Sequence, residues 1–209
     1  FLQDKRVVLV APSKSLMTSR QAALIESYDV VVRLNNGFLT DGIESSVGHR
    51  TDILFHGLNP KKQYRLRLKP CLEKGTSFIS YWGASFNKVS RYKQQVSKKR
   101  LPVRFVHMGD RFQMYRTLGI SSTPKLLIGM GAAFHLSREL FEPKELLLCG
   151  FDFYETAHHP NCYNQSDKES FRRAHATHNI TANKRFLDKL IKTRPWINLD
   201  SITSNALSL

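Results

Sequence analysis

Histidines in the second half of the chain are the residues best suited to acid–base chemistry. His158 and His159 are adjacent and follow an apolar segment, and His175 and His178 come later. An imidazole titrates near neutral pH, so it can take a proton from a hydroxyl group or support a leaving phosphate. The spacing of these four side chains matches no common pattern of zinc ligands. They therefore predict proton transfer, although a histidine considered singly is more often an ordinary surface residue.

Two asparagines, Asn35 and Asn36, follow a β-branched apolar segment and precede Gly37. An asparagine side chain both donates and accepts hydrogen bonds, which suits a ribose hydroxyl or the edge of a nucleobase. Asn-Gly is also a common turn sequence. At this point a nucleotide contact and a simple turn are both open interpretations.

Small hydroxyl side chains stand at two further places where the chain leads into a helix. Ser13 follows the first apolar segment, and Ser122 and Thr123 precede a long apolar segment. Hydroxyls and free N–H groups at the start of a helix can bind an anion. The same residues also make an ordinary helix cap, which is the commoner case.

The elements that must position these residues alternate between strands and helices. Short apolar strands separated by helices indicate a mostly parallel sheet covered on both faces. We therefore expect a single Rossmann-like α/β domain over residues 1–209, which is either a whole protein or a fragment of a larger one. The expected strands are Arg6–Ala11, Asp29–Leu34, Thr51–His56, Ser77–Trp82, Val103–His107 and Leu146–Phe151, and the expected helices are Ser15–Tyr28, Leu126–Phe141 and Lys168–Lys192.

Ligands of such sheets bind beyond the carboxyl ends of the strands, which is where the asparagines, Gly150, Phe151 and the histidine pair lie. Three common nucleotide motifs are absent: GxGxxG, GxxxxGK[ST] and the DxD that often holds a metal ion against a nucleotide diphosphate. A nucleotide with a single phosphate could still be bound without metal by backbone N–H groups, hydroxyls, asparagine and histidine.

The formal net charge of +15 is high for a chain of 209 residues. Such a surplus attracts phosphates, acidic sugars, nucleic acids or anionic membrane surfaces, and it also occurs on a merely solvated surface. The basic residues are spread along the sequence without the aromatic and basic signature of an RNA-binding module. We therefore expect no nucleic-acid partner, and an anionic membrane surface remains open.

The three cysteines, Cys71, Cys149 and Cys162, are widely spaced and form no CxxC. This pattern argues against a disulfide framework or a structural zinc site and favours a reducing compartment. No uncharged apolar stretch is long enough to span a membrane. We expect a cytoplasmic protein, with attachment to the inner membrane face as an alternative, rather than one of the Golgi lumen.

Four segments, in order, resemble the motifs of the eukaryotic-type sialyltransferases. The stretch VVLVAPSKS…DVVVRLNNGF…SSVGHRTDILFH resembles the large sialylmotif, and GISSTPKLLIGMGAAFHLSRELFEPKELLLCGFDFY resembles the small one. His158-His159 and His178 fall where the third and very small motifs have their histidines. The resemblance implies a sialyltransferase-like variant of the GT-A fold that transfers an acidic ulosonic sugar from a CMP-activated donor to a glycan or glycolipid hydroxyl.

The resemblance also implies roles for individual residues. His178 would be the general base, and His159 or His158 would stabilise the leaving CMP. The reaction would be an inverting displacement without metal or other cofactor, in which the CMP-sugar is a co-substrate. The residues that would line the nucleotide pocket are Ser13, Asn35, Asn36, Ser122, Thr123, Gly150 and Phe151.

Several positions depart from the family pattern. Pro12 stands in place of an asparagine of the first turn, Pro124 in place of a glycine, and Asn183 in place of a glutamate. Val7 and Ser137 replace two cysteines that form a disulfide in the family, which fits a cytosolic, bacterial relative. These changes leave two alternatives open: a CMP-Kdo transferase of bacterial surface polysaccharide synthesis, and a relative that binds CMP without turnover. The net charge of +15 leaves a third, a non-catalytic polyanion- or nucleic-acid-binding module.

Overall fold

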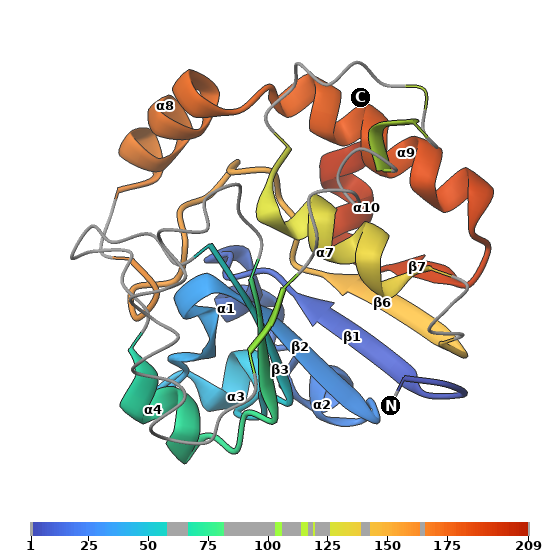
Figure 1. The fold of residues 1–209 in the computed structure, drawn as a ribbon. Coiled ribbons are helices and arrows are strands. Elements are labelled where there is room, and N and C mark those ends of the chain that lie inside the picture. The colour runs from blue at the N-terminus through green and yellow to red at the C-terminus, as the bar shows by residue number, and fades with distance from the viewer. Residues whose placement is uncertain are drawn as a thin grey trace.

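The structure is a computed structural model that describes residues 2–57, 67–81, 103–105, 114–116, 119, 126–138, 143–163 and 166–208. Its centre is a seven-stranded sheet in the order β5-β4-β3-β2-β1-β6-β7, and every neighbouring pair is parallel (Figure 1). The predicted α/β fold with a parallel sheet is therefore confirmed. The strands are β1 (Arg6–Val10), β2 (Val30–Leu34), β3 (Ile53–His56), β4 (Phe78–Tyr81), β5 (Val103–Phe105), β6 (Glu145–Cys149) and β7 (Ile197–Leu199).

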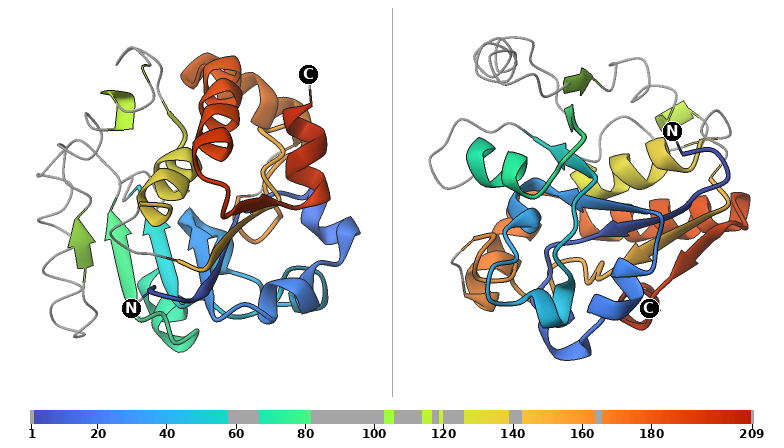
Figure 2. Two further views of the ribbon diagram at one scale, coloured as in Figure 1. Left: turned by 90° about the vertical axis from the view of Figure 1, so that its right-hand side faces the viewer. Right: turned by 90° about the horizontal axis from the view of Figure 1, so that it is seen from below.

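Helices cover both faces of the sheet (Figure 2), as expected for strands that are apolar on both sides. One face packs against α7 and α9, and the other packs against the short helices α1 to α3. The helices are α1 (Ser15–Ser19), α2 (Ala22–Glu26), α3 (Glu44–Val47), α4 (Leu68–Glu73), α7 (Ile128–Leu136), α8 (Asp167–Thr177), α9 (Ile180–Thr193) and α10 (Ser201–Leu207), together with the 3-10 turn η1 (Asn35–Phe38).

Strand β1 is the point at which the strand order reverses. It pairs with β2 on one side and with β6, far along the chain, on the other. The loops after β1 and β6 therefore leave the sheet side by side at its carboxyl edge. A crevice at such a switch point is the usual ligand site of an open parallel sheet.

Two predicted helices are each broken into two. The expected helix Ser15–Tyr28 ends early because Arg20 adopts a left-handed conformation with φ of 48°. The expected helix Lys168–Lys192 is interrupted at His178, which has extended backbone and ends α8. Asn179 then starts α9, because its side chain accepts a hydrogen bond from the N–H of Ala182 at 2.9 Å. Strand β7 and helix α10 were not predicted.

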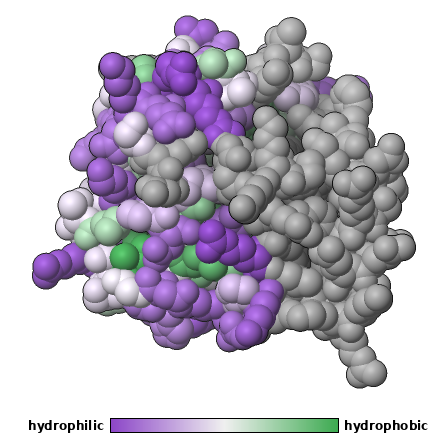
Figure 3. Space-filling model, turned by 90° about the vertical axis from the view of Figure 1, so that its left-hand side faces the viewer, coloured by the Kyte–Doolittle hydropathy of each residue, from purple (hydrophilic) through white to green (hydrophobic). Residues whose placement is uncertain are grey.

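All three cysteines, Cys71, Cys149 and Cys162, are free and buried in the structure. On the face shown in Figure 3, the described surface is mostly hydrophilic, with a small hydrophobic group near its middle. The large apolar side chains exposed among the described residues are Leu24 and Phe171. Within the described ranges, every helix is too short or too polar to cross a membrane.

Candidate functional site

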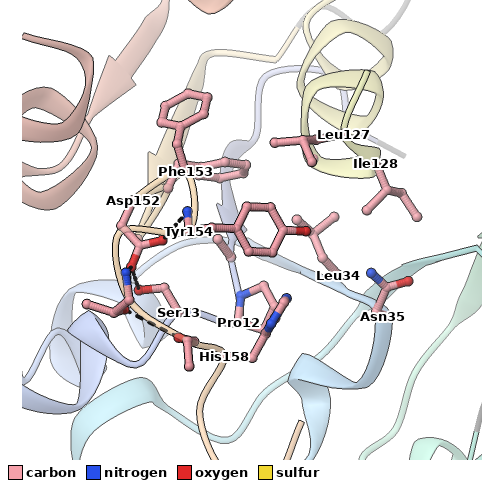
Figure 4. Close-up of a pocket in the computed structure, with 16 residues that line it drawn as sticks. Pro12, Ser13, Leu34, Asn35, Leu127, Ile128, Asp152, Phe153, Tyr154 and His158 are labelled. Atoms are coloured by element: carbon pink, nitrogen blue, oxygen red, sulfur yellow. Dashed lines mark hydrogen bonds between the residues drawn. The ribbon is translucent and has the colours of Figure 1, made fainter. Parts of the chain in front are cut away.

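A pocket of about 520 Å³ opens at the switch point beside β1 (Figure 4). The loops after β1, β2 and β6 form one part of its wall, and the first residues of α7 form another. A concave site that is mainly apolar, with a few converging polar groups, is typical of small-molecule binding. Its lining residues are Ala11, Pro12, Ser13, Leu34, Asn35, Leu127, Ile128, Gly129, Gly150, Phe151, Asp152, Phe153, Tyr154, Thr156, Ala157 and His158.

Backbone hydrogen bonds join the loops after β1 and β6. The N–H of Lys14 donates to the carbonyl of Ala157 at 2.8 Å, and the N–H of His159 donates to the carbonyl of Pro12 at 2.9 Å. Gly37 packs against this pair so closely that a Cβ there would lie 2.9 Å from the Cβ of Pro12. The three loops are therefore fixed relative to one another before any ligand binds.

Asp152 organises the polar side of the pocket, and sequence reasoning did not single it out. Its Oδ2 accepts hydrogen bonds from the hydroxyls of Ser13 at 3.0 Å and Ser15 at 2.7 Å. The same oxygen accepts from the N–H and the hydroxyl of Thr156, and Oδ1 accepts from the N–H of Tyr154. The carboxylate thus ties the loop after β1 to the loop after β6.

Gly150 and Phe151 lie in the pocket wall, but their N–H groups bond elsewhere. The N–H of Gly150 donates to Oδ2 of Asp200 at 3.0 Å, and the N–H of Phe151 donates to the hydroxyl of Thr203 at 3.0 Å. Gly150 also has φ of +77°, and a Cβ there would lie 2.7 Å from Leu16. Gly150 therefore contributes to the wall through its backbone conformation and its lack of a side chain, because its N–H is already bonded to Asp200.

Asn35 lies in the pocket wall, and its backbone has φ of 50°, a left-handed conformation that asparagine tolerates well. Its Oδ1 accepts the N–H of Gly57 at 3.2 Å, which fixes the side chain at the end of β2. Asn36 is 1% exposed and does not line the pocket. The structure thus brings one of the two predicted asparagines to the site.

The adjacent histidines separate into one pocket residue and one buried residue. His158 lines the pocket, whereas His159 is 1% exposed and its Nδ1 accepts the N–H of Cys162 at 3.3 Å. Burial lowers the pKa of His158 to about 4, and burial together with the nearby Arg33 lowers the pKa of His159 to about 4. Both rings are therefore neutral at physiological pH. Among the described residues, Nδ1 of His158 has no hydrogen-bond partner.

Tyr154 connects two of the predicted histidines and was not predicted as a site residue. Its ring lies 5.3 Å from that of His158, nearly edge to face, and 6.5 Å from that of His178, nearly parallel. Figure 4 shows Tyr154 reaching across the pocket toward Leu34. Burial raises the pKa of Tyr154 to about 12, so its hydroxyl remains a hydrogen-bond donor. His178 lies behind Tyr154 and does not itself line the pocket.

The first residues of α7 form the apolar side of the pocket. Leu127 precedes the helix without a side-chain cap, and Ile128 and Gly129 begin it. The first N–H groups of a helix have no partner within the helix, so such an end favours an anion. The predicted residues Ser122 and Thr123 lie outside the described residues.

Asn183, where the motif resemblance implies a glutamate, holds the start of α7 in place. It is fully buried, and its Oδ1 accepts the N–H of Leu127 at 2.8 Å. Its Nδ2 donates to the carbonyl of Asn179 at 2.8 Å. The substitution therefore retains an acceptor oxygen that links α9 to the pocket wall.

Residues 3–127, more than half of the chain, match the family described as glycosyltransferase family 29 (sialyltransferase). The chain belongs to this family. It is 27% identical over 93% of its length to a type 2 lactosamine alpha-2,3-sialyltransferase of Mus musculus, and 27% identical to the Rattus norvegicus protein of the same name. It spans 65% and 64% of the length of these two relatives.

Solved structures of sialyltransferases share the fold. The sialyltransferase CstII from Campylobacter jejuni, in complex with the substrate analogue cytidine-5'-monophosphate, has a TM-score of 0.58 at 15% identity, covering 98% of this chain and 84% of that one. A mammalian sialyltransferase in complex with Gal-beta-1-3GalNAc-ortho-nitrophenol has a TM-score of 0.56 at 17% identity, covering 94% and 69%. The predicted family and its Rossmann-like fold are therefore confirmed.

Within the described part of the chain, no group of three or more histidine, cysteine, aspartate or glutamate side chains is arranged to hold a metal ion. The one carboxylate among the described pocket residues, Asp152, is occupied by hydroxyl and N–H donors. The polar groups that do face the pocket are suited to hydrogen bonding with a nucleotide.

Proposed function

We propose that this family member transfers an acidic ulosonic sugar from a CMP-activated donor to a hydroxyl of a glycan acceptor. The observation that carries the proposal is the pocket at the β1–β6 switch point, lined by Asn35 and His158 and bounded by the start of α7. The positive end of that helix suits the single phosphate of a CMP-sugar. The relatives in the family have names that specify sialic acid transfer, which favours sialic acid over Kdo as the sugar.

His178 is the proposed general base. It follows α8, and its ring faces Tyr154, which itself reaches into the pocket. An acceptor hydroxyl that enters beside Tyr154 would give its proton to the imidazole of His178 as the new glycosidic bond forms. General-base catalysis of this kind contributes about 10²- to 10⁴-fold to the rate.

The leaving CMP takes the electron pair of the broken bond on its phosphate oxygen. His158 is neutral, and the hydroxyl of Tyr154 is protonated, so both can donate hydrogen bonds to that oxygen. The N-terminus of α7 adds electrostatic stabilisation of the leaving phosphate. Pre-positioned hydrogen-bond donors and dipoles of this kind usually make the largest single contribution to lowering the activation barrier. In this proposal no metal ion takes part.

The test measures CMP release from CMP-sialic acid and from CMP-Kdo in parallel, with and without a chelator. We expect release from CMP-sialic acid that requires an acceptor glycan and is insensitive to the chelator. Release from CMP-Kdo alone would assign the other sugar. CMP binding without turnover in the presence of varied acceptors would identify a relative that has lost catalysis, and the absence of CMP binding would overturn the proposal.

His178→Ala gives the matching test of the general base. We expect a loss of turnover of about 10²-fold or more, with CMP affinity retained. His175→Ala is the control, because His175 lies at the end of the same helix, is exposed and contacts Phe171. Equal rates for the two variants would remove His178 from the mechanism.

A further inference from the structure

Asp152 carries negative charge into a pocket that is proposed to bind a phosphate. It is 7% exposed, and it is the only acidic side chain among the described residues that line the pocket. No lysine or arginine of the described segments lies within ion-pair distance of it. Among the described residues, hydroxyl and N–H dipoles stabilise the carboxylate, and no basic side chain there neutralises its charge.

The carboxylate determines the direction of the surrounding hydroxyl groups. A carboxylate only accepts hydrogen bonds, and each hydroxyl has a single hydrogen to donate. The hydroxyls of Ser15 and Thr156 donate to Oδ2 of Asp152, and the hydroxyl of Ser13 donates either to that oxygen or to Oγ of Ser15. In each case the hydroxyl hydrogen is used inside the network. Ser13 and Thr156 also line the pocket, so the part of each hydroxyl that remains for a ligand is an oxygen lone pair. This side of the pocket therefore accepts hydrogen bonds.

The two sides of the pocket differ in electrostatic character. Figure 4 shows Asp152 and Ser13 on one side and Ile128 and Asn35 on the other. A phosphate beside Asp152 would meet a like charge and hydroxyls that have no hydrogen to offer. The opposite side begins a helix, whose N-terminus attracts an anion.

We propose that Asp152 is a specificity-determining residue that sets the orientation of the nucleotide. The uncharged part of the nucleotide places a hydrogen-bond donor, either a ribose hydroxyl or the 4-amino group of cytosine, against Ser13 and Thr156. The phosphate is then directed to the start of α7. This inference rests on the proposed function and assigns the recognition chemistry of that same site.

The test substitutes Asp152→Asn, which keeps the shape but places an NH₂ group where Oδ2 accepts. The NH₂ group has two hydrogens, so up to two of the three hydroxyls then turn their lone pairs toward Asn and their hydrogens away from it. Calorimetric titrations compare CMP, UMP and 2′,3′-dideoxy-CMP for the wild-type protein and the variant. The loss of one hydrogen bond at a charged network corresponds to about tenfold in affinity.

Two results support the inference and name the group that is recognised. If the 4-amino group is the donor, CMP affinity falls about tenfold while UMP affinity is unchanged or rises, since the uracil oxygen accepts from the reversed hydroxyls. If a ribose hydroxyl is the donor, CMP and UMP weaken together and 2′,3′-dideoxy-CMP is unaffected. Equal losses for all three ligands, or no change for any, would overturn it.

Two further variants make the result independent of folding defects. Thr156→Val removes one hydroxyl at nearly constant shape, and we expect the same ligand-selective loss at smaller size. Asp167→Asn is the control, because Asp167 accepts the N–H of Ala157 at 2.9 Å yet does not line the pocket. Equal behaviour of Thr156→Val and wild type would overturn the inference even if Asp152→Asn does not fold. If the wild-type protein binds none of the nucleotides, the proposed function fails as well.

Discussion

The two sides of the pocket are built in opposite ways. On the β6 side, Asp152 and Asp200 gather hydroxyl and N–H groups into buried networks, so nearly every polar group there has a partner within the protein. On the α7 side, Leu127, Ile128 and Gly129 present an apolar surface and the uncapped start of a helix. The comparison indicates that the β6 side supplies rigidity and hydrogen-bond polarity, whereas the α7 side leaves its helix dipole for a phosphate.

The largest expected effect comes from removing the support of the β6 side. Asp200→Ala would leave the N–H groups of Gly150 and Thr203 without their acceptor, and the second of these hydrogen bonds is the N-cap of α10. We expect a loss of about 4 kcal/mol in unfolding free energy, measured by urea titration. Asp188→Ala is the control, since Asp188 pairs with Lys192 at the surface. Equal stabilities of the two variants would contradict the structural role of the Asp200 network.

A somewhat smaller effect is expected when the anchor of the α7 side is removed. Asn183→Ala leaves the buried N–H of Leu127 without an acceptor, which costs about 2–3 kcal/mol. Asn183→Asp retains the acceptor oxygen, and we expect it to recover part of the stability and most of the CMP affinity. Urea unfolding and calorimetry measure the two quantities. If Asn183→Asp is no more stable and binds CMP no more tightly than Asn183→Ala, the hydrogen bond to Leu127 does not account for the role of this residue.

The close fit between the two sides gives a third prediction. A Cβ at Gly129 would lie 2.5 Å from Cε1 of Phe151 and 3.1 Å from Cδ1 of Leu34. Gly129→Ala therefore pushes the sides apart, and we expect a loss of about 1–3 kcal/mol in stability together with weaker CMP binding. Gly57→Ala is the control, because its nearest contact would be an ordinary 3.8 Å to Asn35. A neutral Gly129→Ala would show that the sides are not in contact.

Acid gives the fourth prediction. Burial lowers the pKa of His56 to about 3 and that of His159 to about 4, while the unfolded chain binds these protons near pH 6.5. Stability is therefore complete above pH 6.5 and falls as the pH drops toward 4, by up to about 1.4 kcal/mol per pH unit for each histidine. Urea unfolding at pH 7 and pH 5 measures this slope. His159→Gln should reduce it, and an unchanged slope would contradict the assignment.

The strands could be predicted from sequence because buried parallel strands are short apolar runs. The positions of Ser13 and Asn35 at the pocket follow from their places just after such strands, and His158 lies further along the loop that follows β6. The helix predictions were less accurate, since periodicity does not show the left-handed Arg20 or the extended His178 that interrupt them.

The hydrogen-bond networks of the site could not be predicted. Asp152 bonds to Ser13, which is 139 residues away in sequence, and Gly150 bonds to Asp200, which is 50 residues away. Only the fold brings these pairs together. The sequence Gly150-Phe151-Asp152 after a strand indicated the correct loop. It did not indicate that the N–H groups of Gly150 and Phe151 bond toward α10 while the side chain of Asp152 lies at the pocket.

A crystal structure of the protein with CMP tests the central claim most directly. We expect CMP in the switch-point pocket, with its phosphate at the N–H groups of Ile128 and Gly129. Its ribose or cytosine is expected to lie against Ser13 and Thr156. A CMP molecule bound in the reverse orientation, with its phosphate beside Asp152, or bound at another place on the protein, would contradict it.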